Sequence, residues 1–352
     1  MAFRYSDKYK KYSLDMHVNV TRDEFLKQFD PEALAKDIIS TGAEAGMMYI
    51  QSHYGYSYWP PNVGEMPPGL IGNEDAFKRL YDEMHKGGMD VDVYFSMIYN
   101  NWAYDHHPEW RIKDINGNYS RDKGRRFGLC CPNSEGYKKF CRDQIADFTE
   151  YVGSYEAFFA DMTFWPTVCY CDNCRARWEK EVGGEMPRIV NWKDERWKLF
   201  QRKREEWLQD YMQYIYDSVK MVNPGAVVEM QNSTMPASWM MGVTENATIA
   251  SDAVSGDLYG GFSQQTFACK LYYNMTPNLP FNYTTSRCEP SLDEHTTIKS
   301  EVMMKLHAML SFINHGSNIF VDAVDMTGTY EPLVYSRLKN VYDDAAKFEK
   351  YF

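Results

Sequence analysis

The sequence predicts an α/β fold of the (β/α)8 TIM-barrel type. Short apolar segments alternate with longer amphipathic segments along the whole chain, and parallel strands need crossover helices of this kind. Eight such repeats can be distinguished, which favours closure into a barrel over an open sheet. The length of 352 residues and the 44% hydrophobic content suit one barrel over residues 1–352. We expect any further C-terminal domain to lie outside this chain.

The first half of the chain is predicted from short apolar runs and helix-end signals. Asp30 and Pro31 open a helix, because Asp suits the cap and Pro the first turn. Gly87 and Gly88 end another helix. The predicted strands cover residues 13–20, 46–51, 89–97 and 157–161, and the predicted helices cover 31–41, 74–85 and 134–152.

The second half repeats the same alternation. Its longest helical region, residues 194–221, is highly charged and carries large aromatic residues at helical spacing. Pro224 and Gly225 end this region. The predicted strands cover residues 226–231, 252–257, 280–286 and 318–322, and the predicted helices cover 194–221, 263–275, 293–314 and 331–350.

The segment that ends at Asp161 carries the main functional signal. Residues 157–160 are short, apolar and aromatic, which is typical of a strand buried on both faces. Asp161 follows directly, and Phe164, Trp165 and Pro166 come soon after. A lone carboxylate among aromatic residues at a strand end is a common setting for sugar chemistry. The alternative is an Asp that caps the following turn.

In a barrel of this type, the site lies at the C-terminal ends of the strands. Polar side chains there are costly to bury unless they are paired or functional. In chain order the predicted strand ends offer Asp15, His17, His53, Tyr54, Tyr94, Ser96, Asp161, Glu229, Gln231, Asn232, Asp257, Tyr259, Arg287, Glu289, Asp322 and Asp325.

Carboxylates, histidines and aromatic residues without a phosphate-binding loop favour glycoside hydrolysis. Retention needs two carboxyl groups roughly 5–5.5 Å apart, a charged nucleophile and a protonated acid. Asp161 is the predicted nucleophile, and Glu229, Asp257 and Glu289 are candidates for the acid. Glu229 could instead pair with Arg287, and Asp257 could cap a turn. The sequence contains no nucleophile elbow and no His-Glu-x-x-His zinc motif.

Composition excludes several classes of partner. The net charge is −11 and no basic stripe is present, so we expect no nucleic acid and no anionic membrane surface. No apolar run approaches the ~18 residues of a membrane span, and the polar N-terminus lacks a signal core. These features predict a cytoplasmic protein. The charged face of residues 194–221 is compatible with a homo-oligomer, although such faces are usually only solvated.

The eight cysteines are concentrated rather than spread as in a disulfide framework. Cys169, Cys171 and Cys174 lie within six residues, and Cys131 precedes the helix that leads to the same strand. Four thiolates would form a closed, structural zinc site. The alternative is a group of free buried thiols. We expect no cofactor for catalysis itself.

Three segments resemble the α-L-fucosidases of glycoside hydrolase family 29 and its relatives. They are Gln51-Ser-His53-Tyr54-Gly-Tyr-Ser-Tyr-Trp59-Pro, Tyr94-Phe95-Ser96, and Phe158-Phe159-Ala160-Asp161 with Trp165-Pro166. The resemblance implies that Asp161 is the nucleophile, that His17 and His53 contact the sugar, and that the anomeric configuration is retained. This chain has Tyr54 where the family has a second histidine and Met162 where it has a glycine. It offers no clear match to the family's acid/base segment.

A second resemblance concerns the thiols. Cys131-Pro-Asn-Ser134 with Cys169-x-Cys171-x-x-Cys174 is similar to the four-cysteine zinc site of family 42 β-galactosidases. The segment ending at Asp161 lacks that family's Asn-Glu pair, so its activity is not carried over. Together the two resemblances are closest to the hypothetical glycoside hydrolase barrels between these groups.

The sequence therefore predicts a catalytic barrel that acts as a retaining exo-glycosidase, most similar to an α-L-fucosidase. Asp161 attacks, and Glu229 or Asp257 protonates the leaving oxygen. The expected substrate contacts are His17, His53, Tyr54, Trp59, Tyr94, Trp165 and Arg287. The alternatives are a non-catalytic carbohydrate-binding barrel and a glycosidase for another sugar such as a β-galactoside.

Overall fold

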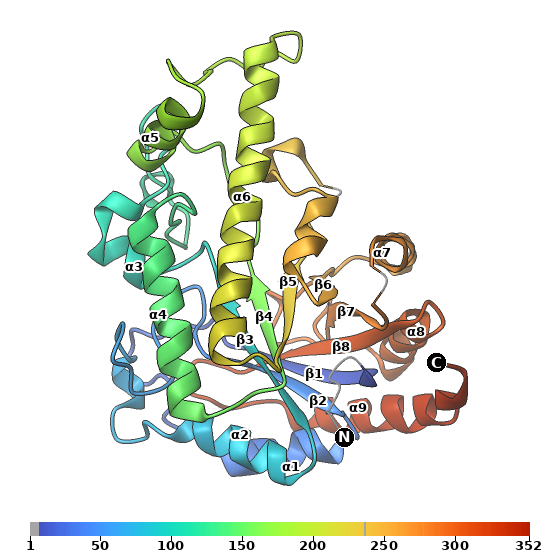
Figure 1. Cartoon of the computed structure of the whole chain (residues 1–352). Coiled ribbons are helices and arrows are strands. Elements are labelled where there is room, and N and C mark those ends of the chain that lie inside the picture. Colours follow the sequence, from blue (N-terminus) through green and yellow to red (C-terminus); the bar gives the residue numbers. More distant parts are fainter. Residues whose placement is uncertain (1–6, 236, 277) are drawn as a thin grey trace.

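A computed structural model describes residues 7–235, 237–276 and 278–352. In these residues eight parallel strands form a closed barrel, because β1 pairs with both β2 and β8 (Figure 1). The predicted (β/α)8 TIM barrel is confirmed. The strands are β1 Lys10–Asp15, β2 Ala45–Tyr49, β3 Asp90–Ser96, β4 Ala157–Asp161, β5 Val227–Gln231, β6 Ala253–Asp257, β7 Phe281–Ser286 and β8 Gly316–Ala323.

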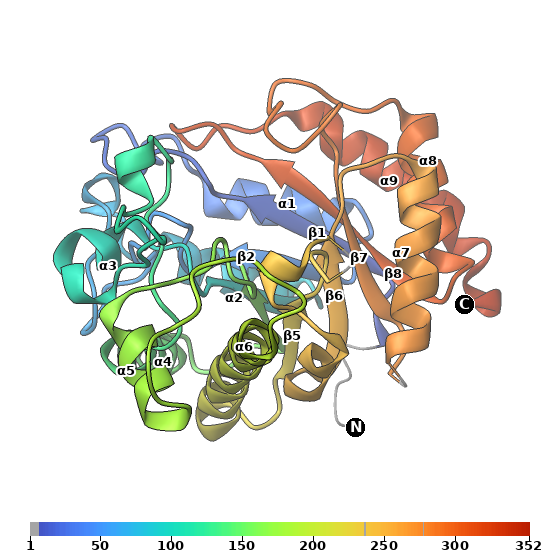
Figure 2. The same ribbon diagram turned by 90° about the horizontal axis from the view of Figure 1, so that it is seen from above.

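Helices surround the barrel on its outside, as the view in Figure 2 shows. The α-helices are α1 Pro31–Ser40, α2 Ala76–Lys86, α3 Asn101–His106, α4 Glu135–Val152, α5 Asp172–Glu181, α6 Glu195–Val222, α7 Phe262–Met275, α8 Glu301–Phe312 and α9 Pro332–Ala346. The described 3₁₀ helices are η2 Pro68–Leu70, η3 Pro108–Trp110, η4 Arg121–Lys123, η5 Trp239–Met241, η6 Glu245–Ala250 and η7 Glu349–Tyr351. No helix in the described part of the chain is both long and apolar enough to cross a membrane.

Local sequence signals account for the helix starts. The side chain of Asp30 accepts a hydrogen bond from the backbone nitrogen of Ala33 at 2.9 Å, as expected of a cap. Ser134 and Asp194 cap α4 and α6 in the same way. These caps satisfy backbone N–H groups that the first turn of a helix leaves without partners.

Three elements differ from the sequence prediction. The first strand ends at Asp15, so residues 16–20 belong to the following loop. α8 begins at Glu301 instead of residue 293, because residues 287–300 form a loop over the barrel mouth. The short helices α3 and α5 lie in excursions that carry little hydrophobic periodicity, and the prediction missed them.

A long arm stands above the barrel on the side of β4 and β5. α6 rises well beyond the strands, and α5 lies beside its upper half (Figure 1). Trp197, Phe200 and Trp207 on α6 are buried. Trp178 of α5 packs edge-to-face on Phe200, with 5.5 Å between the ring centroids. The aromatic spacing predicted for this helix therefore holds the arm together.

Candidate active site

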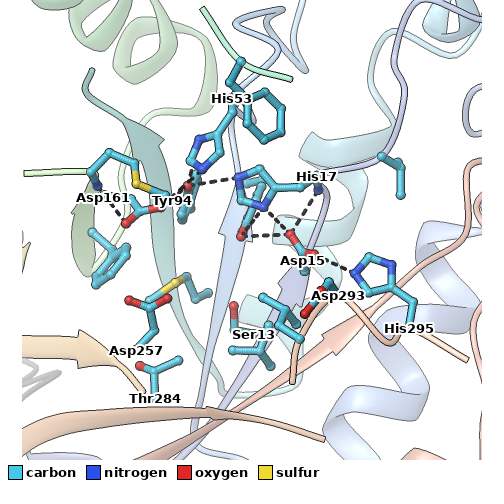
Figure 3. Close-up of a pocket in the computed structure, with 18 of the residues that line it drawn as sticks. Ser13, Asp15, His17, His53, Tyr94, Asp161, Asp257, Thr284, Asp293 and His295 are labelled. Atoms are coloured by element: carbon cyan, nitrogen blue, oxygen red, sulfur yellow. Dashed lines mark hydrogen bonds and ion pairs between the residues drawn. The ribbon is translucent and has the colours of Figure 1, made fainter. Parts of the chain in front are cut away.

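A pocket of about 570 Å³ opens at the C-terminal ends of the strands (Figure 3). This is the end at which barrel enzymes carry their sites. Carboxylates and histidines from different strands face apolar side chains across it. The residues that line it are Ser13, Asp15, His17, Val18, Asn19, Met47, Tyr49, His53, Tyr94, Arg126, Phe127, Phe159, Asp161, Met162, Asp257, Tyr259, Thr284, Leu292, Asp293, His295, Val321 and Met326.

Asp161 ends β4 inside this pocket and is only 5% exposed. The Tyr94 hydroxyl donates a hydrogen bond to its Oδ2, and the Met162 backbone N–H donates to its Oδ1 at 2.7 Å. Burial, followed by the negative charge of Asp257, raises the pKa of Asp161 to about 7. Asp161 therefore changes its charge near neutral pH, where both acid and nucleophile chemistry are accessible.

Met162 adopts a backbone conformation that favours glycine. Its φ is +58°, in the left-handed region, and such a conformation costs a side-chain-bearing residue roughly 1–2 kcal/mol. This backbone turn directs the Met162 N–H onto Asp161. The chain thus keeps the turn at the position where the fucosidase family has a glycine, with a side chain that lines the pocket.

Asp257 ends β6 and lies on the same side of the pocket as Asp161 in Figure 3. Its Oδ1 accepts a hydrogen bond from Gln231 Nε2 at 2.6 Å, and its Oδ2 accepts one from the Tyr259 hydroxyl at 2.8 Å. The Ser233 hydroxyl donates to Oδ1 at 3.4 Å. These donors fix the position of the carboxyl group. Asp257 is therefore a carboxyl group of the pocket and not the cap of a turn.

His17 follows β1 and is held by Asp15. Its Nδ1 hydrogen-bonds to Asp15 Oδ1, and its Nε2 lies 3.2 Å from the Tyr94 hydroxyl. Asp15 also forms an ion pair with His295, with 3.1 Å between Oδ2 and Nε2. Although burial alone raises the pKa of Asp15, the charges and hydrogen bonds of His17 and His295 lower it well below the usual range. Asp15 is thus a carboxylate fixed between two histidines (Figure 3).

His53 stands next to His17, with 3.9 Å between the ring centroids. The Ser96 hydroxyl donates to the Tyr99 carbonyl at 2.7 Å, so it accepts from His53 Nδ1, also at 2.7 Å. His53 Nε2 is then an acceptor, 3.9 Å from Asp161 Oδ2. Burial and the positive charge of His17 lower the pKa of His53 well below its ordinary value. His53 is therefore neutral at pH 7.

Glu229, a predicted acid, does not line this pocket. It is 0% exposed inside the barrel. Burial lowers the pKa of Lys11 to about 8, and the charges of Glu229 and Asp92 oppose that effect. Lys11 also donates to Asn282 Oδ1 at 2.8 Å. The structure therefore corrects the placement of Glu229, which balances a buried cation because its strand position points it into the barrel core.

Arg287, a predicted substrate contact, also lies outside the pocket. Its Nε donates to Asp322 Oδ1 at 2.8 Å, and its Nη1 donates to the His295 carbonyl at 2.7 Å. The Tyr12 and Tyr335 hydroxyls donate to Asp322 as well. Arg287 thus anchors the loop that carries His295. The exposed third acid candidate, Glu289, lies on the same loop and does not line the pocket.

The tryptophans predicted to stack on sugar are both buried elsewhere. Trp59 is 1% exposed, and its indole nitrogen donates to Asp147 of α4 at 3.2 Å. Trp165 is also 1% exposed, and its indole nitrogen donates to the Arg204 carbonyl of α6 at 2.8 Å. Neither ring offers a face to the pocket, because each one seals a helix against the barrel.

Tyr54, a predicted substrate contact, does not line the pocket but contacts two lining residues, Arg126 and Phe127, that the sequence did not single out. Arg126 donates to the Tyr54 hydroxyl and, at 2.5 Å, to the His17 carbonyl, and its guanidinium lies over the Phe127 ring. The Tyr54 and Phe127 rings meet edge-to-face at 5.6 Å. Arg126 and Phe127 come from the long excursion after β3. Its aromatic and basic composition was the sequence feature that could have indicated a contribution to the site.

The structure therefore brings together His17, His53, Tyr94, Asp161 and Asp257 of the predicted set. One ring nitrogen of His17, one of His53 and one carboxylate oxygen of Asp161 lie within 4.8 Å of one another. His295 was missed because it was expected inside a helix. Asp15 and Tyr259 had appeared only as polar residues at strand ends.

The four predicted metal-ligand cysteines also meet. The sulfur atoms of Cys131, Cys169, Cys171 and Cys174 lie within 4.8 Å of one another and are buried. Cys131 and Cys174 are 3.5 Å apart at sulfur, and Asn133 Nδ2 donates to Cys174 Sγ at 3.3 Å. A zinc ion with ~2.3 Å bonds places neighbouring sulfurs roughly 3.8 Å apart. The group has the donors and the spacing to bind a metal ion.

No known family model matches this sequence, and no curated protein matches it. Solved structures of similar fold include α-L-fucosidase isoenzyme 2 from Paenibacillus thiaminolyticus, with a TM-score of 0.79 and 16% identity over 98% of this chain and 50% of that one. A β-galactosidase from Halorubrum lacusprofundi has a TM-score of 0.68 and 14% identity over 96% of this chain and 58% of that one. The chain thus spans between half and three fifths of those two proteins.

The glycoside hydrolase domain of PgaB from Bordetella bronchiseptica has a TM-score of 0.70 and 10% identity. That alignment covers 95% of this chain and 98% of the other. Similarity at these identities supports the barrel fold, which agrees with the strand pairing described above. The expected resemblance to fucosidase and other glycoside hydrolase barrels is confirmed at the level of structure.

Proposed function

We propose that this chain is a catalytic barrel that hydrolyses glycosides with retention, as an exo-acting α-L-fucosidase-like enzyme. The observation that carries the proposal is the pair Asp161 and Asp257 in one pocket. Burial, and after it the charge of Asp257, raises the pKa of Asp161 to about 7, so the two carboxyls interact. Two interacting carboxyls that share a proton supply the ionised and the protonated group that retention needs. Burying two interacting carboxyl groups costs folding free energy, and sugar binding alone does not require such a pair.

In the first step Asp161 attacks the anomeric carbon, and the bond to the leaving oxygen breaks. In the state in which Asp161 is ionised, the proton that the pair shares lies on Asp257, which gives it to that oxygen, and the carboxylate that remains is stabilised by Gln231 and Tyr259. In the second step Asp257 removes a proton from water. The resulting hydroxide attacks the same carbon and releases Asp161 as a carboxylate, which Tyr94 and the Met162 N–H stabilise.

The proposed sugar follows from the two kinds of surface in the pocket. His17 and His53 line the sugar-sized space, and His53 Nε2 is an acceptor there. Met47, Phe159, Met162, Val321 and Met326 form an apolar lining that suits the methyl group of a 6-deoxy sugar. The fucosidase of similar fold supports this choice. The β-galactosidase of similar fold makes a galactoside the first competing substrate to test.

We also propose that the four cysteines hold a structural zinc ion. Four buried sulfur donors form a closed ligand set that leaves no position for water or substrate. The buried guanidinium of Arg204 lies close enough for the charges of Cys174 and Cys169 to affect its pKa. A tetrathiolate zinc site carries a net negative charge, and a buried cation offsets that charge. The ion would fix the loop after β4 and take no part in the reaction.

The direct test is hydrolysis of a panel of 4-nitrophenyl glycosides, with α-L-fucoside and β-D-galactoside as the principal pair. Proton NMR of the first-formed sugar gives the anomeric configuration. We expect cleavage of the fucoside with retention, and much weaker cleavage of the galactoside.

Cleavage of another glycoside with retention would show that the proposed substrate is wrong and that the proposed mechanism is right. Inversion would overturn the roles of Asp161 and Asp257. Fucose binding seen by calorimetry, without hydrolysis of any glycoside, would favour the carbohydrate-binding barrel.

A further inference from the structure

A continuous chain of polar contacts connects the rim of the pocket with Asp161. It runs from His295 through Asp15, His17 and Tyr94, and each link is a hydrogen bond or ion pair (Figure 3). The chain joins the loop after β7 to β1, β3 and β4. Asp15 is its most buried ionised member, with a side chain 2% exposed. A buried carboxylate stays ionised only where hydrogen bonds and opposite charges offset the free energy of removing it from water.

We propose that Asp15 is a positioning residue for the reaction, which holds His17 doubly protonated so that His17 donates to Tyr94 and Tyr94 donates to Asp161. This inference rests on the proposed function, because it assigns Asp15 an effect on the nucleophile of that reaction. Asp15 itself does not touch the reacting atoms. It acts only through His17.

The directions of the hydrogen bonds carry the argument. A tyrosine hydroxyl has a single proton, and Tyr94 donates it to Asp161 when that carboxyl is ionised for attack. Tyr94 can therefore only accept from His17, so His17 Nε2, 3.2 Å away, must carry a proton. The Asp15 carboxylate can only accept, so His17 Nδ1 must carry a proton as well. When Asp161 is ionised, both ring nitrogens of His17 therefore face acceptors, and this is the arrangement that Asp15 would maintain.

Asp15 is built to keep that positive charge in place. Its Oδ1 also accepts from the His17 backbone N–H at 3.0 Å and from the Tyr49 hydroxyl at 3.2 Å. These bonds fix the carboxylate and leave it no freedom to turn toward a substrate. The same positive charge lowers the pKa of His53, after the larger effect of burial. One histidine is thereby a donor and its neighbour an acceptor.

The titratable and charged groups around His17 come from several elements. Those within reach are Asp15 from β1, Tyr49 from β2, His53 from the loop after β2, Tyr94 from β3, Arg126 from the loop before α4, Asp161 from β4, Asp257 from β6 and His295 from the loop after β7. Arg126 is a cation and His295 is itself a partner of Asp15, so neither can replace Asp15 as the counter-charge. Asp161 is the other carboxylate connected to His17, through Tyr94.

The expected result of Asp15→Asn is loss of a proton from His17 at pH 7. A neutral His17 then leaves Tyr94 without its donor and Asp161 without a nearby positive charge. Because His17 opposes the effects that raise the pKa of Asp161, we expect the acidic limb of the kcat/KM profile to move to higher pH by roughly one unit. Asp15→Glu should restore part of this shift.

The test combines two measurements on the full chain. Nitrogen-15 NMR of histidine-labelled protein reads the protonation of both His17 ring nitrogens at pH 7, with His17→Gln to assign the signals. The pH profile of glycoside hydrolysis is measured in parallel. Asp325→Asn is the matched control, because Asp325 follows the neighbouring strand β8 and its side chain accepts from Thr327 and Thr329.

Protonated His17 in the wild type and neutral His17 in Asp15→Asn support the proposal, whether or not a substrate is known. His17 that stays protonated in Asp15→Asn would overturn it. Lower activity with an unmoved pH profile would reduce Asp15 to a structural role. His295→Gln should leave His17 protonated. If His17 loses its proton in that variant, Asp15 needs His295 to hold His17 protonated, and the proposed order of the polar contacts is wrong.

Discussion

Two polar clusters among the described residues have opposite character, the pocket at the barrel mouth and the four-cysteine cluster beside α5. The pocket gathers side chains from strands and loops spread over most of the chain, from Ser13 to Met326. The cysteine cluster draws three of its four members from residues 169–174. In the pocket, two carboxyl groups destabilise each other's charged forms. In the cluster, a single metal ion would bind all four sulfur atoms.

Their effects on stability should therefore differ in sign. Asp161 and Asp257 line one pocket, and burial together with the charge of Asp257 raises the pKa of Asp161. Such an arrangement lowers the stability of the fold and makes the carboxyl groups more reactive. The cysteine cluster, with a metal ion bound, fixes a loop and an arm, and metal binding then adds to folding free energy. The comparison predicts that changes in the pocket alter rates, whereas changes in the cluster alter stability.

The largest effect is expected from Asp161→Asn. An amide cannot attack the anomeric carbon as the carboxylate does, so kcat should fall by about three orders of magnitude or more. The melting temperature at pH 8 should stay the same or rise, because the substitution removes a buried charge beside Asp257. Nitrophenyl glycoside assays and calorimetry measure the two quantities. Unchanged turnover would exclude Asp161 as the nucleophile.

Asp257→Asn should have the next largest effect, and the effect should depend on the leaving group. Loss of a general acid costs about 10²–10⁴ in rate for poor leaving groups. Activated aryl glycosides need little protonation and should lose less. Azide should rescue the variant, because a charged nucleophile needs no general base in the second step. The control is Glu229→Gln, whose side chain lies outside the pocket, and an equal dependence on leaving group there would contradict the assignment.

The same comparison explains how much the sequence could predict. Barrel architecture is encoded in repeated local patterns, so the strand at residues 157–161 was predicted with both of its ends correct. The cysteine cluster was predictable because its members are close in sequence. The pairing of Asp161 with Asp257 depends on the registers of β4, β5 and β6, and no local pattern encodes them.

Buried aromatic residues were the main source of error. Trp59 and Trp165 follow strand ends, as sugar-stacking residues do, but each pairs its indole nitrogen with a group on a surrounding helix. Sequence position alone does not distinguish the two cases. Arg287 was misplaced for a related reason, because a charged residue at a strand end can point outward to Asp322 as readily as into the barrel.

The cysteine cluster should respond in the opposite way to the pocket. Cys171→Ser removes one of four ligands, so we expect loss of bound metal and a melting temperature lower by roughly 5–10 °C. The kcat of the folded fraction should change less than about twofold. Elemental analysis and calorimetry measure these effects, and a chelator applied to the wild type gives the same comparison if the variant does not fold.

Cys141→Ser is the matched control for that substitution. Cys141 is a buried thiol that hydrogen-bonds with the Tyr211 hydroxyl and lies outside the cluster. It should keep its metal content. Equal metal content in wild type and Cys171→Ser would show that the four cysteines are free thiols.

The smallest effect, and the finest test of the comparison, is the pH dependence of stability. Burial and Asp257 raise the pKa of Asp161 to about 7 in the folded protein, whereas an unfolded Asp titrates near 3.9. The folded state therefore binds this proton more tightly, and stability from this group is lost as pH rises from about 4 to about 7. The difference in melting temperature between Asp161→Asn and the wild type should grow across that range and level off above it. A constant difference would mean that neither burial nor Asp257 raises the pKa of Asp161, and the proposed contrast between the pocket and the cysteine cluster would then fail.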